Sequence, residues 1–239
     1  MCLQYIKIRN RSNKNGIHYA YVPCGKCADC RRKEQQEWTF RLRTEFGALK
    51  EQGWNIGFIT LTYSPDCLPT IPEECFKDDT QYREIVCFDR DTVRKWIADI
   101  RQYCKYHYKM VKGDNIRYFI TSEYGSHTKR PHYHAILAWP SDKGCDYKTM
   151  HALCDHFWSK GLVGPQNYQG DRNCRSFEVQ GDSTSVLKYV CKYVSKDIDY
   201  VDEVKDIDFY HNVKEYEKGS DDYWKARRYD TRHYPFHIL

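Results

Sequence analysis

Residues 118–134, YFITSEYGSHTKRPHYH, predict two β-strands joined by a loop. The first part is rich in aromatic and β-branched residues, and residues 124–131 contain the Gly, Ser, Thr and Pro that form turns. Because successive side chains of a strand point to opposite faces, His132 and His134 share one face. Symmetric pairing of the two strands places Glu123 opposite His132, and directly opposed residues also share a face. The sequence therefore predicts two imidazoles and one carboxylate close together.

Side chains of these types are suited to holding a divalent metal ion. Imidazole and carboxylate groups bind hard or borderline cations, and a site with three protein ligands leaves positions open for a substrate oxygen. We therefore expect His132, His134 and Glu123 to bind Mg²⁺ or Mn²⁺. The alternative is that the two histidines belong to an ordinary strand, and the position of Glu123 favours the metal site.

The 239-residue chain has the composition of a globular protein, with 41% hydrophobic and 30% charged residues. This length is enough for one large domain or a domain with an appendage. No apolar stretch approaches the roughly 20 residues that span a bilayer, and the first residues lack the apolar part of a secretion signal. We therefore expect no membrane partner and a reducing cytoplasm, where the 12 cysteines are thiols or metal ligands.

The positive charge of the chain is concentrated near its N-terminus. Residues 1–50 contain 11 Lys and Arg against 4 Asp and Glu, whereas the whole chain has a net charge of only +5. This basic segment, which includes Arg31 and Arg32, is the better candidate for binding a phosphate backbone. A soluble surface with uneven charge is the alternative.

Three cysteines in the basic segment have the spacing of a metal-binding knuckle. Cys24, Cys27 and Cys30 are each separated by two residues. A ferredoxin-type iron–sulfur cluster would need a cysteine where Glu34 stands, so Zn²⁺ is the better candidate. A structural zinc ion needs four ligands, and Cys2 is the nearest upstream thiol. A histidine, a more distant cysteine or three free thiols are the alternatives.

Apolar periodicity predicts further strands and helices on both sides of the hairpin. We expect strands at residues 17–22, 58–63, 84–88 and 176–180, and helices at residues 31–53, 89–108 and 147–159. The segment 64–81 contains three prolines and is expected to form a loop. Since the histidine strand is joined by a hairpin to its predecessor, we predict an α+β fold. It has a mainly antiparallel central sheet flanked by helices and an N-terminal Cys-rich knuckle.

A further helix is predicted over residues 183–198, STSVLKYVCKYVSKDI. Its apolar residues fall within one arc and form the buried stripe, whereas Tyr189 and Tyr193 project near the opposite side. Three lysines form a neighbouring ridge: Lys188, Lys192 and Lys196. A phenol with a pKa near 10 is a poor nucleophile unless a cation or a base assists it, and the lysines could assist it and hold a phosphate. Surface tyrosines on an ordinary helix are the alternative.

With these motifs the chain resembles the HUH endonucleases, a superfamily of rolling-circle replication initiators and relaxases named after a His-hydrophobic-His motif. Three motifs stand in the family's order: FITLTY at 58–63, RPHYHAIL at 130–137 and YVCKYVSK at 189–196. The two adjoining Y-x-x-K units and the cysteine knuckle are similar to those of the replication initiation proteins of gokushovirus-type Microviridae.

The resemblance implies a metal-dependent DNA endonuclease and strand transferase. His132, His134 and Glu123 would be the metal ligands, and Tyr189 and Tyr193 would be the nucleophiles. They would form 5′-phosphotyrosine bonds with single-stranded DNA at a viral origin, and so start and end rolling-circle replication. Lys192 and Lys196 would assist them, and other residues would contact DNA: Thr60, Thr62, Arg31, Arg32 and Lys188. The implied location is the cytoplasm of a bacterial host, with a host helicase and replication machinery as candidate partners.

The sequence suggests three segments: the knuckle and basic helix at 1–54, the endonuclease core at 55–200 and a C-terminal tail at 201–239. Aromatic and basic residues of the tail, such as Tyr223 and Trp224, could stack on single-stranded DNA, and a packing role is the alternative. Two other functions compete with the endonuclease. One is a non-catalytic zinc-knuckle regulator that binds DNA, and the other is a metal-dependent hydrolytic nuclease.

Overall fold

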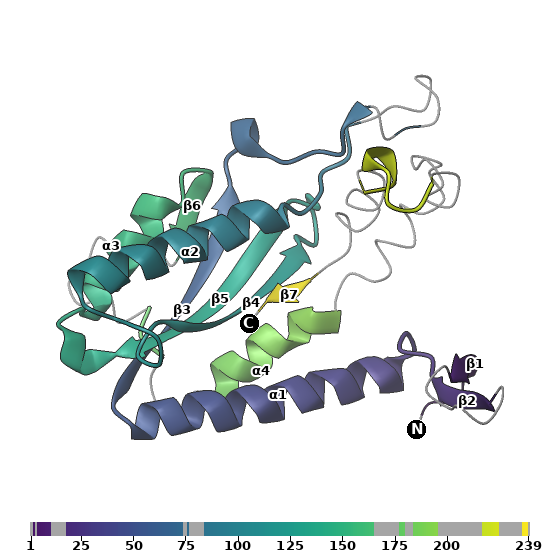
Figure 1. Cartoon of the computed structure of the whole chain (residues 1–239), viewed down its shortest axis with the longest axis horizontal. Helices are drawn as coiled ribbons and strands as arrows, with labels where there is room; N and C mark the ends of the chain where they lie inside the picture. Colours follow the sequence, from purple (N-terminus) through teal and green to yellow (C-terminus); the bar gives the residue numbers. More distant parts are fainter. Residues whose placement is uncertain are drawn as a thin grey trace.

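A five-stranded antiparallel sheet forms the middle layer of the computed structural model, with helices on both faces (Figure 1). Its strands occur in the order β6, β3, β5, β4 and β7, which are Gly161–Gly164, Trp54–Tyr63, Pro131–Pro140, Arg117–Tyr124 and His237–Ile238. The structure describes residues 2, 4–10, 18–73, 76, 84–164, 177–179, 184–195, 217–224 and 236–238. The predicted α+β class, with an antiparallel sheet flanked by helices, is confirmed.

The hairpin of β4 and β5 has the register that the sequence predicts. Glu123 pairs with His132, and Thr121 pairs with His134. On the other side of β5, Thr60 of β3 also pairs with His134. Because paired residues share a face, polar side chains from three neighbouring strands gather on one side of the sheet.

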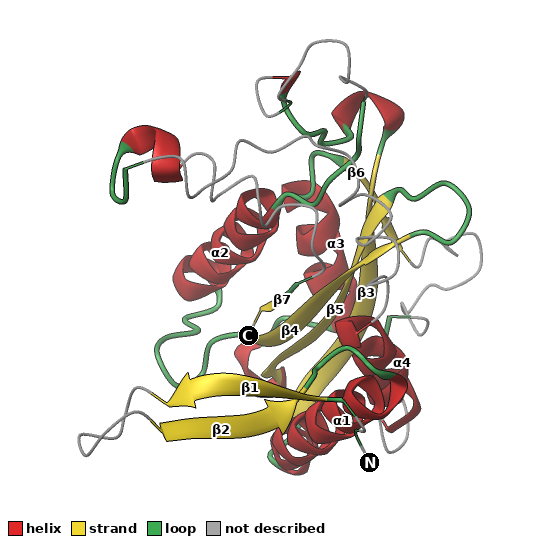
Figure 2. Cartoon of the chain, turned by 90° about the vertical axis from the view of Figure 1, so that its right-hand side faces the viewer, coloured by secondary structure: helices red, strands yellow, loops and turns green. Residues whose placement is uncertain are grey.

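Helices α2 (Arg90–His107) and α3 (Tyr147–Phe157) cover one face of the sheet, and α1 (Ala28–Glu51) and α4 (Thr184–Lys192) cover the other (Figure 2). Alternate strand residues contribute to two separate buried clusters. The cluster on the α2 side includes Leu61, Trp96, Ile120, Tyr133 and Leu137. The cluster on the α1 side includes Leu42, Phe46, Phe119, Ile136 and Leu187. Helices α1, α2 and α3 and strand β3 correspond to predicted elements.

A separate two-stranded sheet precedes α1. Strand β1 (Tyr5–Asn10) pairs antiparallel with β2 (His18–Pro23). The second strand corresponds to the prediction at residues 17–22, whereas the sequence analysis does not predict β1. The small sheet lies beyond the N-terminal end of α1 (Figure 1), and the C-terminal part of this helix packs on the large sheet. Helix α1 therefore links the N-terminal hairpin to the main core.

The predicted strand at residues 84–88 is wrong. Within it Val86 makes one isolated bridge, to Thr70 in the preceding loop. That loop contains three prolines, and a proline has no N–H to extend a ladder of hydrogen bonds. The pairing therefore stops at a single bridge.

Two other predicted elements are shorter in the structure. Within the predicted strand 176–180, Glu178 makes one isolated bridge to Gly57 of β3. The predicted helix 183–198 ends as an α-helix at Lys192 and continues as one 3₁₀ turn, Tyr193–Ser195. The remaining residues of both ranges lie outside the described residues. Among the described helices, none combines the length and the apolar character that crossing a bilayer requires.

Candidate active site

His134 lies on the polar face of the sheet, next to α4 and the 3₁₀ turn that follows it. Only 4% of this residue is exposed. The ring of Tyr193 stacks on the imidazole with 4.4 Å between centroids, and the ring of Tyr189 meets it edge-on at 5.6 Å. Phe58 of β3 is also nearly parallel to the imidazole, at 5.9 Å. The structure therefore brings the histidine strand and both tyrosines together.

Both ring nitrogens of His134 contact side-chain oxygens. Thr60 Oγ1 lies 3.0 Å from Nδ1, and Glu123 Oε1 lies 2.9 Å from Nε2. A carboxylate oxygen and a bare imidazole nitrogen repel each other, so a proton or a cation must lie between Glu123 and His134. The contact is thus either a hydrogen bond or part of a metal site.

His132 lies two residues away on the same face and is half-buried. Its Nδ1 is 2.7 Å from the carbonyl oxygen of Arg130, which can only accept a hydrogen bond, so Nδ1 donates and Nε2 keeps its lone pair. Burial lowers the pKa of this imidazole and favours its neutral form. A Cβ at Gly125 would lie 3.1 Å from the His132 ring, so a glycine leaves the ring its space. Metal-ligating histidines usually have this arrangement, with the second nitrogen bonded to an oxygen.

The Glu123–His134 pair fits a divalent cation. Two ligands at right angles, each about 2.1 Å from a cation, are about 3.0 Å apart, close to the 2.9 Å between Glu123 Oε1 and His134 Nε2. His132 does not complete a closed set, because four cysteines are the group of ligand atoms within 4.8 Å of one another among the described residues. Two of the three predicted ligands are therefore in contact, and the third lies on the same face.

The two tyrosines differ in exposure, so the prediction that both project away from the buried side is wrong for one of them. Tyr189 is 46% exposed, whereas Tyr193 is only 5% exposed. Their rings meet edge to face at 5.0 Å. The α-helix ends at Lys192, and the tighter 3₁₀ turn changes the direction of the side chains that follow. Tyr189 is therefore open to solvent, and Tyr193 packs on the imidazole.

The threonines of the first motif make hydrogen bonds within the protein. The Thr60 hydroxyl bonds to His134, and the Thr62 hydroxyl donates to the carbonyl oxygen of Leu162 at 3.3 Å. Phe58 is a site residue that the sequence analysis does not single out. Its position two residues before Thr60, on the same face of the strand, is the signal that could have found it.

The predicted basic residues fall in two places. Arg31 Nε donates to the carbonyl oxygen of Lys26 at 2.7 Å and so holds the cysteine loop. Three others line a groove between α1 and α4: Arg32, Lys188 and Lys192. Lys196 and most of the tail lie outside the described residues, in which Tyr223 and Trp224 contact each other at 5.1 Å between ring centroids.

The predicted zinc ligands form a compact group. The sulfurs of Cys2, Cys24, Cys27 and Cys30 all lie within 4.8 Å of one another, and Cys24 Sγ is 3.7 Å from that of Cys2 and 3.9 Å from that of Cys30. Four sulfurs at about 2.3 Å from a tetrahedral zinc ion are about 3.8 Å apart, so this spacing fits. The backbone N–H of Cys27 donates to Cys24 Sγ at 3.3 Å and, with that of Lys26, lowers the pKa of the Cys24 thiol to about 6.

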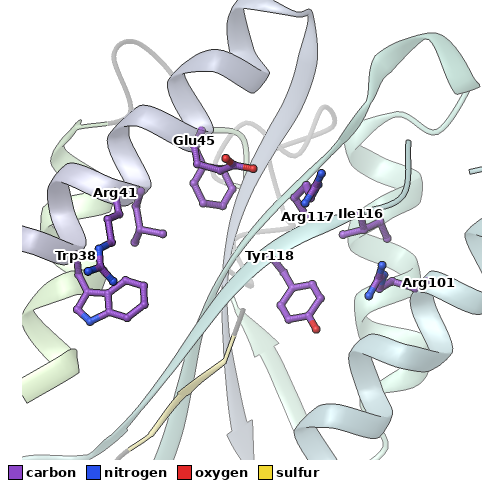
Figure 3. A pocket seen from close by; sticks show the side chains of 9 residues that line it. Trp38, Arg41, Glu45, Arg101, Ile116, Arg117 and Tyr118 are labelled. Atoms are coloured by element: carbon purple, nitrogen blue, oxygen red, sulfur yellow. The ribbon is translucent and has the colours of Figure 1, made fainter. Parts of the chain in front are cut away.

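A hollow of about 460 Å³ lies between α1, α2 and the start of β4 (Figure 3). Aromatic and charged side chains line it, including Trp38, Arg41, Glu45, Arg101, Arg117 and Tyr118. None of the predicted site residues contributes to this hollow. It is therefore separate from the histidine–tyrosine site.

Residues 56–198 match a family whose description begins with replication-associated protein ORF2. This range includes the histidine and tyrosine motifs but not the cysteine group. Over 179 residues, which are 65% of this chain, the sequence is 28% identical to the replication-associated protein ORF2 of Spiroplasma virus 4. That alignment covers 47% of the viral protein, so the chain spans about half the length of this relative. No solved structure matches.

Proposed function

The chain belongs to the replication-associated protein ORF2 family, and on this premise we propose that it initiates viral replication by cutting and rejoining single-stranded DNA. The proposed enzyme is a metal-dependent endonuclease and strand transferase of the HUH type that acts at a viral origin. One observation carries the proposal: the rings of Tyr193 and Tyr189 lie 4.4 and 5.6 Å from the His134 imidazole. A phosphate beside this imidazole is within reach of both phenols.

Tyr189 makes the first cut, because its ring is the exposed one. Its phenolic oxygen bonds to phosphorus, the bond between phosphorus and the 3′-oxygen breaks, and the products are a 5′-phosphotyrosine and a 3′-OH. The phenol loses its proton to solvent, and the leaving oxygen takes one up. Lys192, one helical turn after Tyr189, adds positive charge beside the phenol. His132, His134 and Glu123 would hold Mg²⁺ or Mn²⁺, which when bound draws negative charge from the phosphate.

Tyr193 makes the second cut. After one round of copying it cuts the regenerated origin, and the new 3′-OH attacks the phosphotyrosine at Tyr189. This attack forms the phosphodiester that closes the circle and frees the phenol of Tyr189. Because Tyr193 is packed on His134, its ring must leave the stack before it reaches a phosphate. The proposal also includes a bacterial cytoplasm as the location and a host helicase as a partner.

The test uses labelled single strands that tile the encoding viral genome, incubated with the full chain and Mn²⁺ or Mg²⁺. We expect a covalent protein–DNA adduct that survives denaturing electrophoresis. A Tyr189→Phe/Tyr193→Phe double variant should bind the same strand and form no adduct, and each single variant should keep part of the activity. Free 5′-phosphate ends without an adduct would instead indicate a hydrolytic nuclease, and binding without cleavage would indicate a regulator.

We further propose that the four-cysteine group binds a structural Zn²⁺. The sulfur spacing and the lowered pKa of Cys24 support this ion. Purified protein should contain one zinc per chain by elemental analysis. A Cys27→Ser/Cys30→Ser variant should contain none, and a Cys67→Ser variant, whose cysteine lies outside the group, should keep the metal. A zinc-free wild-type chain with an ordered N-terminal hairpin would contradict the proposal.

A further inference from the structure

A groove of about 430 Å³ runs between α1 and α4. Four basic residues line it, two from each helix: Arg32, Arg43, Lys188 and Lys192. The side-chain amide of Gln35 on α1 donates to the carbonyl oxygen of Lys192 at 3.3 Å and joins the two helices at this point. The helices lie side by side in both views (Figures 1 and 2). The groove is therefore formed by packed helices and has a defined shape.

The charge of this groove is of one sign. None of its described lining residues is acidic. Arg32 lies 3.9 Å from Asp29, but this pair is exposed and contributes little. In the described part of the chain, no carboxylate lies within 4.0 Å of Arg43, Lys188 or Lys192. Like charges held this close repel each other, and a polyanion in the groove would relieve that repulsion.

An aromatic ring and a candidate nucleophile adjoin these cations. Phe40 lines the same groove and is 73% exposed. Single-strand-binding proteins combine basic grooves that follow the phosphates with aromatic rings on which bases stack. On α4, Lys188 directly precedes Tyr189, and Lys192 follows it by three residues, on the same side of the helix. The groove therefore begins next to Tyr189.

We propose that the groove between α1 and α4 binds the sugar-phosphate backbone of single-stranded DNA next to Tyr189. This inference rests on the proposed function, because it gives the path of that substrate. A single strand fits better than a duplex, since its bases are free to stack on Phe40. The groove would keep the cut strand beside the tyrosine while the origin is copied.

The test measures binding of a fluorescein-labelled oligothymidine strand to the full chain by anisotropy, without added Mg²⁺ or Mn²⁺. An Arg43→Gln/Lys188→Gln variant should bind roughly tenfold more weakly at moderate salt. The slope of log K against log salt should fall by about 1.4, because each lost phosphate contact removes about 0.7. A Phe40→Ala variant should also bind roughly tenfold more weakly, with the slope unchanged.

The matched control removes two charges on the opposite face of the sheet. Arg94 and Lys105 are exposed on α2, and an Arg94→Gln/Lys105→Gln variant should keep the wild-type affinity and slope. Equal losses in the groove variant and in this control would overturn the inference. Tighter binding of a duplex that the groove variant loses would overturn the choice of a single strand.

The same variants separate this inference from the proposed function. If the wild-type chain forms no covalent adduct with Mn²⁺ but the groove variant lowers the salt slope, the proposed chemistry fails and the groove stands. If the adduct forms and the groove variant binds as the wild type does, the groove fails and the chemistry stands.

Discussion

The two faces of the central sheet are built from the same strands but have opposite characters. On the α2 side, Tyr133 is fully buried, and its hydroxyl lies 3.2 Å from that of Tyr63 and accepts a hydrogen bond from the N–H of Asp89. Its neighbours His132 and His134 lie on the α4 side with the other polar groups. One face therefore supplies packing and the other supplies chemistry. A shift of one residue in the register of β5 would exchange them.

The largest expected effect breaks the packing face. Trp96 of α2 is buried, and its Nε1 donates to the carbonyl oxygen of Cys154 at 3.0 Å. Trp96→Ala should lower the free energy of unfolding by about 4 kcal/mol, because it leaves a cavity and an unpaired carbonyl. Denaturant titration measures this loss, and the protein that remains folded should nick DNA at the wild-type rate. A loss below about 1 kcal/mol would show that this face does not dominate stability.

The next effect breaks the chemical face and leaves the packing face intact. His132→Ala should lower the nicking rate at least about 10²-fold, or about 3 kcal/mol, because it removes a proposed metal ligand. Its free energy of unfolding should change by less than about 1 kcal/mol, since the residue is half-buried. Tyr133→Phe is the matched control on the other face and should keep the nicking rate. Wild-type nicking by His132→Ala would remove this residue from the proposed site.

The difference between the faces also explains what the sequence could predict. Alternation within two strands and the loop between them were enough to place Glu123 opposite His132, because a hairpin register is local. The burial of Tyr193 depends on the end of α4 and on contact with His134, which helical periodicity does not contain. Strand β7 pairs with β4 from more than 110 residues away, and no local pattern predicts that pairing.

A pH titration sharpens the comparison through a histidine away from the site. His151 of α3 is buried beside Phe177, and burial lowers the pKa of its imidazole. Because the unfolded chain takes up the proton more readily, the contribution of His151 to stability is fully present above the ordinary pKa of 6.5 and is lost as pH falls through the folded pKa.

His151→Gln should therefore flatten the decrease in unfolding free energy that the wild type shows between about pH 7 and about pH 5. Thermal or denaturant unfolding at a series of pH values measures this decrease. His156→Gln, which changes an exposed histidine on the same helix, is the control and should leave the curve unchanged. Identical pH curves for His151→Gln and the wild type would contradict the assignment of this acid sensitivity to His151.

The smallest effect concerns a polar group that the packing of the chemical face leaves unused. Thr121 is fully buried opposite His134 in the register, and its hydroxyl has no hydrogen-bond partner among the described residues. Thr121→Val keeps the shape and removes the unpaired hydroxyl, so it should raise the free energy of unfolding by about 1 kcal/mol. Nicking should fall severalfold, because the hydroxyl lies on the face where Glu123 and the histidines meet. A rise in stability with unchanged nicking would mean that the hydroxyl takes no part in the site, whereas a loss of stability would mean that it is paired in solution.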